Sequence, residues 1–144
     1  MKYTCNKTLP KWERGQIPIW LAQAEDFLRK RYPHVDYFDQ LDLNFSKTRR
    51  GSLYYPGDNA IKIGIHAKLL LYKRKTCTHY APEGGLSVGE AINTICGIIH
   101  ECTHAIQKAE NRVASEVETT QNEIDFLKEK YPYWFNQLIP NSAD

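Results

Sequence analysis

The sequence contains no long apolar run, no strong excess of charge of either sign and no leader-like segment. None of its apolar stretches approaches the roughly 18 residues that a transmembrane helix needs, so we expect no membrane-spanning segment. Residues 1–7 lack the apolar core of a signal peptide, which makes a cytoplasmic location the expectation. The formal net charge is only +2, which by itself is no argument for nucleic-acid binding.

Cysteine is also scarce. The chain has 4 cysteines and no C-x-x-C pair, and Cys96 and Cys102 fall on one predicted helix at a spacing that does not let them meet. We therefore expect reduced thiols rather than a disulfide framework. Cys77 and His79 form too small a group to indicate a metal site by themselves.

Linkers and low-complexity segments are absent as well. The 144 residues therefore predict a single domain spanning residues 1–144, long enough to bury a core without disulfides. Hydrophobic residues make up 42% of the chain and charged residues 25%, so the composition is that of an ordinary globular protein.

The hydrophobic pattern predicts an α+β fold that begins with a helix and a small sheet. Helical spacing of apolar residues covers residues 18–31 and ends before Pro33. Residues 40–46, 52–55 and 59–65 read as three strands. The sequence PGDN between the last two has strong turn chemistry and predicts a hairpin. We therefore expect a small, mostly antiparallel, three-stranded sheet.

Two long helices complete the predicted fold. The first covers residues 87–109, with Ser87 and Glu90 placed as in a capping box and with isoleucines 92, 95, 99 and 106 on one arc. The second covers residues 113–131. Its predicted apolar stripe consists of Val113, Val117, Thr120, Ile124, Leu127 and Tyr131. The short connection between the two helices makes them antiparallel neighbours.

The first of these helices carries the segment His100-Glu101-Cys102-Thr103-His104, which matches H-E-x-x-H. On a helix, histidines four residues apart share a face and can bind one zinc ion, while the glutamate serves as general base. Both histidines fall well away from the isoleucine arc, beside small or polar residues. This arrangement favours a zinc site over the commoner role of a helix histidine, which is structural.

A catalytic zinc site needs a third protein ligand, and no histidine follows His104. On the next helix, residues 116–121 lie at the level of the two histidines. Glu116 fits both this level and the direction of the predicted stripe, whereas Glu123 lies too far along the helix and Glu118 points away. We predict Glu116 as the third ligand. The alternatives are the two other glutamates and a histidine elsewhere: Glu123, Glu118, His66 and His79.

H-E-x-x-H with a glutamate on the next helix resembles the gluzincin class of zinc metallopeptidases, and the short chain resembles the single-domain minigluzincins. The preceding segment RRGSLYYPGDNAIKIGI resembles the hairpin of SprT-like small zincins. The resemblance covers about residues 41–127 and implies a zincin-like fold. Two departures are the lack of the third histidine of SprT-like proteins and the presence of Thr119 and Thr120 where gluzincins often carry an aspartate.

Motif and resemblance together predict a zinc metallopeptidase. His100, His104 and Glu116 would hold Zn²⁺, and Glu101 would take a proton from the activated water and deliver it to the leaving amine. The candidate oxyanion donors are Tyr54, Tyr55, His79, Tyr80 and Tyr131. By resemblance, residues 61–66 would be an edge strand along which an extended peptide or protein substrate adds.

Two other functions stay open at this point. A zincin scaffold can serve as a metal-binding regulatory module without hydrolysis, and such a module would tolerate Glu101→Gln. The basic segments 47–50 and 73–75, with tyrosines nearby, could bind phosphates and stack bases, although solvated turns are the usual meaning of such runs. Nothing in the sequence indicates an oligomeric state.

Overall fold

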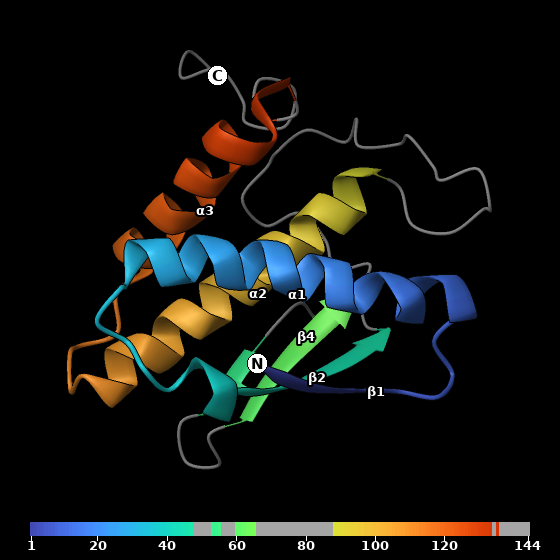
Figure 1. Ribbon diagram of the computed structural model, residues 1–144, viewed down its shortest axis with the longest axis horizontal. Helices are drawn as coiled ribbons and strands as arrows, with labels where there is room; N and C mark the ends of the chain where they lie inside the picture. The colour runs from blue at the N-terminus through green and yellow to red at the C-terminus, as the bar shows by residue number, and fades with distance from the viewer. Residues whose placement is uncertain (48–52, 56–59, 66–87, 134, 136–144) are drawn as a thin grey trace.

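The computed structural model describes residues 1–47, 53–55, 60–65, 88–133 and 135, and within them the chain has the predicted α+β fold (Figure 1). In this described part of the chain, three helices and a short 3-10 helix accompany four strands. In chain order the elements are β1 (Lys2–Cys5), α1 (Lys11–Arg31), η1 (Phe38–Gln40), β2 (Asp42–Lys47), β3 (Leu53–Tyr55), β4 (Ala60–Ile65), α2 (Val88–Ala109) and α3 (Glu116–Lys130).

The sheet differs from the predicted one in strand number and direction. Its described strands lie in the order β1-β2-β4-β3, and β2 runs parallel to both β1 and β4. The prediction of a mostly antiparallel, three-stranded sheet is therefore wrong, because the three strands β1, β2 and β4 are all parallel. The predicted hairpin is confirmed as the antiparallel pair of β3 and β4, while its PGDN turn lies outside the described residues.

Two features of the chain hide this topology. β1 carries mostly exposed side chains at the edge of the sheet, so it lacks the apolar alternation that indicates a strand. β2 and β3 are separated by only five residues, 48–52, a length that favours an antiparallel hairpin between them. The chain instead places β3 on the outer side of β4, which brings β4 beside β2 in the parallel direction.

β4 is an interior strand over residues 60–62, with β2 on one side and β3 on the other. The expected edge strand at residues 61–66 is therefore wrong for Ile61, while His66 lies outside the described residues. Within the described sheet, the outer strands are β1 and β3.

The core lies between the sheet and the helices. Leu43 pairs in register with Ile61 and Phe45 with Ile63, and all four side chains are buried on one face of the parallel pair. α2 contacts β4 and β3 and is in turn packed against α1 and α3 (Figure 1). The predicted isoleucine arc of α2 is confirmed, since the side chains at positions 92, 95, 99 and 106 are all buried.

α1 begins at Lys11, a full two turns before the predicted start at residue 18. Pro18 lies inside the helix at an exposed position, so it does not mark the helix start. The predicted end is confirmed, because Tyr32 caps the helix just before Pro33.

A tight turn joins α2 to α3. Asn111 adopts a left-handed conformation with φ 56°, the N–H of Arg112 donates to the carbonyl of Gln107, and the N–H of Asn111 donates to that of Lys108. These bonds form a Schellman motif, which satisfies the last carbonyls of α2. Ser115 then caps α3 by accepting a hydrogen bond from the N–H of Glu118.

α3 turns a different face to the core from the predicted one. Val113 and Val117 of the predicted stripe are 89% and 81% exposed. The buried residues of α3 are Thr119, Asn122, Glu123, Phe126 and Leu127. The observed face is rotated from the predicted stripe by roughly one residue, about 100° of helix. Polar side chains make up much of this face, so counting apolar residues does not find it.

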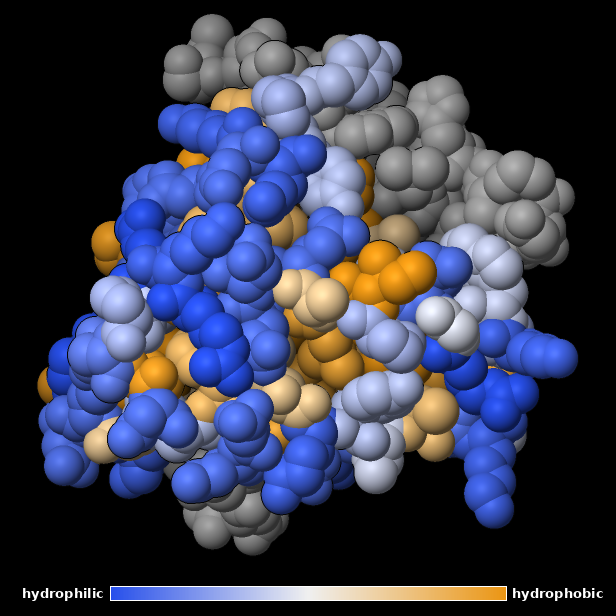
Figure 2. Space-filling view, viewed as in Figure 1, coloured by the Kyte–Doolittle hydropathy of each residue, from blue (hydrophilic) through white to orange (hydrophobic). Residues whose placement is uncertain are grey.

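Among the described helices, none has both the length and the apolar composition needed to cross a membrane. Cys5, Cys96 and Cys102 are free thiols, as predicted, while Cys77 lies outside the described residues. The face drawn in Figure 2 is largely hydrophilic, with hydrophobic residues gathered near its middle.

Candidate metal centre

Helices α2 and α3 bring His100, His104 and Glu116 together. Their donor atoms all lie within 4.8 Å of one another, and among the described residues this is the group of histidine, cysteine and carboxylate side chains that could hold a metal ion. The two histidines are one turn apart on α2, and Glu116 is the first residue of α3. The tight α2–α3 turn therefore places the predicted third residue opposite the predicted pair.

One carboxylate faces both imidazole rings. Oε1 of Glu116 is 2.9 Å from Nε2 of His104, and Oε2 of Glu116 is 3.2 Å from Nε2 of His100. The two rings are steeply inclined to each other, with centroids 4.9 Å apart and an interplanar angle of 75°. Both Nε2 atoms are thus directed at the same small volume.

The donor set fits zinc in type and spacing. Zinc binds nitrogen and oxygen ligands at about 2.0–2.2 Å, so two ligand atoms of a tetrahedral ion lie about 3.3 Å apart. The 2.9 and 3.2 Å separations are close to that value. Three protein ligands of this kind leave a fourth position for a water or substrate. The Glu116 side chain is 72% exposed, so the group opens to solvent.

The second nitrogen of each ring is also engaged. Nδ1 of His100 lies 3.3 Å from Oε2 of Glu123, and Nδ1 of His104 lies 3.0 Å from Oε1 of Gln107. Such partners orient a metal-binding imidazole and fix which nitrogen carries the proton. The sequence names Glu123 only as an alternative ligand; the structure places it behind His100. Glu123 lies two helical turns after Glu116, so both side chains project from the same side of α3, toward α2. This spacing is the feature of the sequence that could have predicted its position.

Glu101 is buried beside this group, with 6% of its surface exposed. Burial raises the pKa of its carboxyl group, although the charges of His100 and His104 act in the opposite direction. Burial likewise raises the pKa of Glu123, although its hydrogen bond with His100 lowers it. The charges of Glu116 and Glu123 add to the rise in the pKa of Glu101.

The surrounding carboxylates favour positive charge at the imidazoles. Burial alone would lower the pKa of His100, but the hydrogen bond and charge of Glu123, with the charges of Glu101 and Glu116, raise it overall. The negative charge of these three carboxylates, which favours a proton on His100, also favours a metal cation between the rings.

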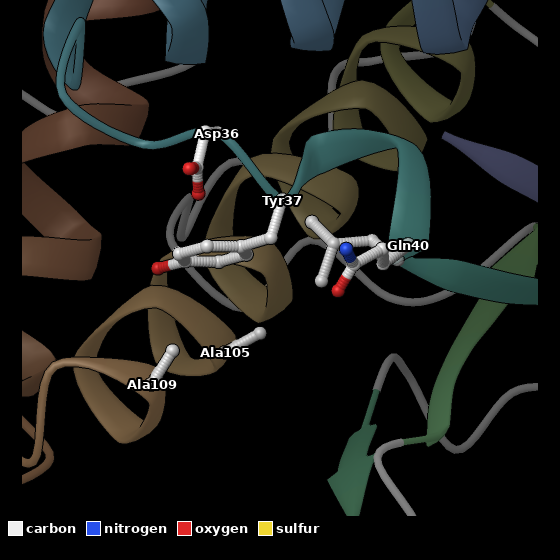
Figure 3. Close-up of a pocket in the computed structure, with 6 residues that line it drawn as sticks. Asp36, Tyr37, Gln40, Ala105 and Ala109 are labelled. Carbon is white, nitrogen blue, oxygen red and sulfur yellow. The ribbon is translucent and has the colours of Figure 1, made fainter.

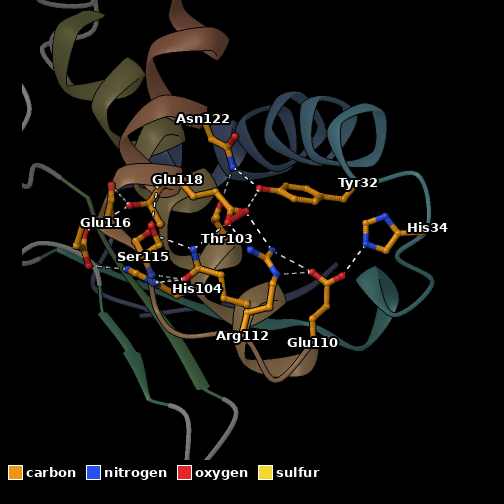
Figure 4. A network of polar contacts seen from close by, with 12 residues as sticks. Tyr32, His34, Thr103, His104, Glu110, Arg112, Ser115, Glu116, Glu118 and Asn122 are labelled. Carbon is orange, nitrogen blue, oxygen red and sulfur yellow. Dashed lines mark hydrogen bonds and ion pairs between the residues drawn. The ribbon is translucent and has the colours of Figure 1, made fainter.

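Glu118 points away from the histidines, as predicted. Its carboxylate accepts hydrogen bonds from Arg112 at 2.6 and 3.1 Å and from the hydroxyl of Tyr32 at 2.7 Å (Figure 4). The hydrogen bonds of Arg112, which outweigh the effect of burial, lower the pKa of Glu118 to about 2. Arg112 also binds Glu110, whose carboxylate contacts His34.

A buried polar contact ties the three helices together behind the candidate centre. The amide of Asn122 donates to Thr103 Oγ1 at 3.0 Å and to the hydroxyl of Tyr32 at 2.7 Å (Figure 4). Thr103 in turn donates to the carbonyl of Ile99. This role of Thr103 was not predicted; its hydroxyl between the two histidines of a largely buried helix is the only sequence signal for it.

The structure leaves several other predicted residues untested. His66, His79, Tyr80 and the segments 48–50 and 73–75 lie outside the described residues, and so does the pair of Cys77 and His79. Tyr54 and Tyr55 lie in β3. Tyr131 donates its hydroxyl hydrogen to Gln23 on α1, a partner outside the candidate centre.

A pocket of about 360 Å³ lies between η1 and the second half of α2 (Figure 3). Its lining consists of Asp36, Tyr37, Gln40, Leu41, Ala105 and Ala109. Because this lining offers one carboxylate and no histidine, the pocket adds no ligand set to the one formed by α2 and α3.

Comparison of the chain with protein-family models, with curated proteins and with solved structures finds no significant match. The interpretation of the centre therefore rests on the H-E-x-x-H segment of α2 and on the position of Glu116 opposite its histidines.

Proposed function

We propose that the protein is a zinc-dependent metallopeptidase, in which His100, His104 and Glu116 hold the metal and Glu101 is the general base. The observation that carries this proposal is the convergence of two imidazole nitrogens and one carboxylate within 4.8 Å. The three come from two helices and satisfy both the ligand types and the spacing that zinc requires.

When bound, zinc supplies a Lewis acid that polarises a carbonyl group and lowers the pKa of a coordinated water toward neutrality. Glu101 follows His100 in the motif and lies outside the ligand group. A carboxylate in that place can accept a proton from the attacking water and deliver it to the leaving amine.

Two features support a peptide substrate. In H-E-x-x-H sites, the glutamate base next to a zinc ligand serves the hydrolysis of amide bonds. In addition, β3 contacts α2 and is the outer strand on its side of the described sheet. An extended peptide can add to an outer strand through main-chain hydrogen bonds, so β3 replaces residues 61–66 as the strand we propose for substrate pairing.

The metal part of the proposal is tested by zinc binding. Metal-free protein should take up one zinc ion per chain, measured by elemental analysis and by competition with a chromophoric chelator. Glu116→Gln should weaken binding strongly, while Glu129→Gln, on the exposed part of the same helix, should leave it unchanged. Wild-type protein that takes up no zinc contradicts the proposal.

The hydrolytic part is tested with a peptide library and mass spectrometry. Cleavage should require zinc and should be lost after His104→Ala. Zinc uptake by the wild type without cleavage of any peptide would contradict the peptidase and leave the metal-binding module, the second function that the sequence allows.

A further inference from the structure

Gln107 is completely buried and connects the two halves of the candidate centre. It lies one turn after His104 on α2 and makes four polar contacts through its amide group. Oε1 is 3.0 Å from Nδ1 of His104 and 3.1 Å from the N–H of Ser115; Nε2 is 3.1 Å from the carbonyl of Ser115 and 3.3 Å from Oε1 of Glu118.

The backbone of Ser115 determines the orientation of the Gln107 amide. A backbone N–H only donates and a backbone carbonyl only accepts, so the amide oxygen must face the first and the amide nitrogen the second. The opposite orientation would set donor against donor and acceptor against acceptor at about 3 Å. The carboxylate of Glu118 beside Nε2 favours the same orientation.

This orientation in turn determines the tautomer of His104. An amide oxygen only accepts, so Nδ1 of His104 must carry a proton to make the 3.0 Å hydrogen bond. In the neutral ring, Nε2 then has a free lone pair, which is directed at Oε1 of Glu116 2.9 Å away. A lone pair and a carboxylate oxygen at this distance are stable together only with a metal cation or a second ring proton between them.

The same amide also places Glu116. Ser115 is the N-cap of α3, and Gln107 holds both its N–H and its carbonyl oxygen. Glu116 is the next residue, so the backbone from which its side chain extends is attached to the helix that carries His104. One side chain thus controls the tautomer of one ligand and the position of another.

From these contacts we propose that Gln107 is the positioning residue of the centre: it holds His104 with Nδ1 protonated and anchors the start of α3 so that Glu116 lies opposite the histidines. The inference rests on the proposed metal site for its functional meaning, but the tautomer that it assigns is a property of the metal-free protein.

The first experiment measures the tautomer of the neutral His104 ring by ¹⁵N-resolved NMR of metal-free protein. In the wild type, Nδ1 should be protonated and Nε2 should not be. Gln107→Met has a side chain of similar length without the acceptor, and should shift His104 toward a mixture of tautomers. Gln107→Glu keeps the acceptor for His104 and Ser115 and should retain the wild-type tautomer.

The second experiment measures zinc affinity of the same proteins by chelator competition. Gln107→Met should weaken binding by about 10- to 100-fold. Gln107→Glu should bind more weakly than the wild type but better than Gln107→Met, because it loses both donated bonds to Ser115 and Glu118 yet keeps the tautomer. Gln121→Met, at an exposed position of α3, is the control and should bind as the wild type does.

An Nε2-protonated His104 in the wild type overturns the inference, even if Gln107→Met fails to fold. It is also overturned if Gln107→Met is folded by circular dichroism and binds zinc with wild-type affinity. Wild-type protein with the expected tautomer that binds no zinc would contradict the metalloenzyme proposal while leaving the assignment of His104 correct.

Discussion

Glu116 and Glu118 lie two residues apart on α3 and have different partners. Glu116 is largely exposed and faces both histidines, whereas Glu118 binds Arg112 and Tyr32. Two residues along a helix correspond to about 200° of rotation, so neighbouring glutamates cannot share a target. At the scale of single residues, direction therefore decides which carboxylate can be a ligand and which is structural.

Glu101→Gln should retain zinc but lose hydrolysis. The amide cannot accept a proton from the water, and loss of a general base typically costs about 10²–10⁴ in rate. The measurement pairs zinc stoichiometry with the cleavage rate of a peptide selected from the library. Hydrolysis at the wild-type rate by a zinc-loaded Glu101→Gln protein would exclude Glu101 as the base.

Tyr32 should make the protein less stable at alkaline pH. Burial, together with the charge of Glu118, raises its pKa to about 12 from 10.0. Between these values the unfolded chain loses the tyrosine proton while the folded chain keeps it, so stability falls as pH rises, by at most about 1.4 kcal/mol per pH unit. Tyr32→Phe should lack this loss.

Urea unfolding of the wild type and of Tyr32→Phe at about pH 9 and about pH 11 measures this effect. The stability difference between the two proteins should shift in favour of Tyr32→Phe at the higher pH. The same difference at both values would show that Tyr32 keeps an ordinary pKa in the folded protein.

At the scale of elements, α3 is a helix whose buried face is partly polar. Its buried face combines Phe126 and Leu127 with the polar residues Thr119, Asn122 and Glu123. Phe126 packs edge-to-face against Phe27 of α1 with ring centroids 5.6 Å apart. Of the predicted stripe, Val113 and Val117 face solvent, while Leu127 is buried as predicted. Glu116 lies between the predicted and the observed faces, which is why it still lies opposite the histidines although the stripe was misplaced.

Two substitutions distinguish the faces of α3. Val117→Ser should change the free energy of unfolding by no more than about 0.5 kcal/mol, as expected for an exposed position. Phe126→Ala should cost about 3–5 kcal/mol because it empties a buried aromatic site. Chemical denaturation measures both. A large cost for Val117→Ser would mean that Val117 faces the core, as the sequence predicted.

At the scale of the molecule, α2 is the central element. It contacts the sheet on one side, packs against α1 and α3, and carries two of the three candidate ligands (Figure 1). A metal bound between α2 and α3 would link α3 to α2, and through α2 to the sheet. Metal occupancy and global stability should therefore be coupled.

Zinc should raise the midpoint of thermal unfolding, and a chelator should reverse the change. A ligand that binds only the folded state at 100 times its dissociation constant adds about 2.7 kcal/mol. Differential scanning calorimetry with and without zinc measures the shift. His104→Ala should show no shift, while the control Glu129→Gln should show the full one; an equal shift in both variants would place the zinc elsewhere.

The local features of the chain were predictable because they depend on neighbours in sequence. The 3.6-residue period gives the isoleucine face of α2, the i and i+4 spacing puts His100 and His104 together, and the tight turn brings Glu116 to their level. The proline-containing turn and the isoleucines predict the β3–β4 hairpin. Each of these predictions uses geometry that spans one turn of helix or one short connection.

The sequence by itself determined the two helices of the candidate centre and the three residues that meet there. Only the tertiary structure decided the parallel direction of β1, β2 and β4, the inclusion of β1 in the sheet and which face of α3 is buried. It also decided that Gln107 and Glu123 contact the histidines. The physical reason is that strand order and helix rotation depend on the pairing of distant backbone and buried polar groups. Asn122 and Gln107 are polar, so the hydrophobic pattern of the sequence does not reveal that they are buried. Their amides find their hydrogen-bond partners only when α1, α2 and α3 pack together.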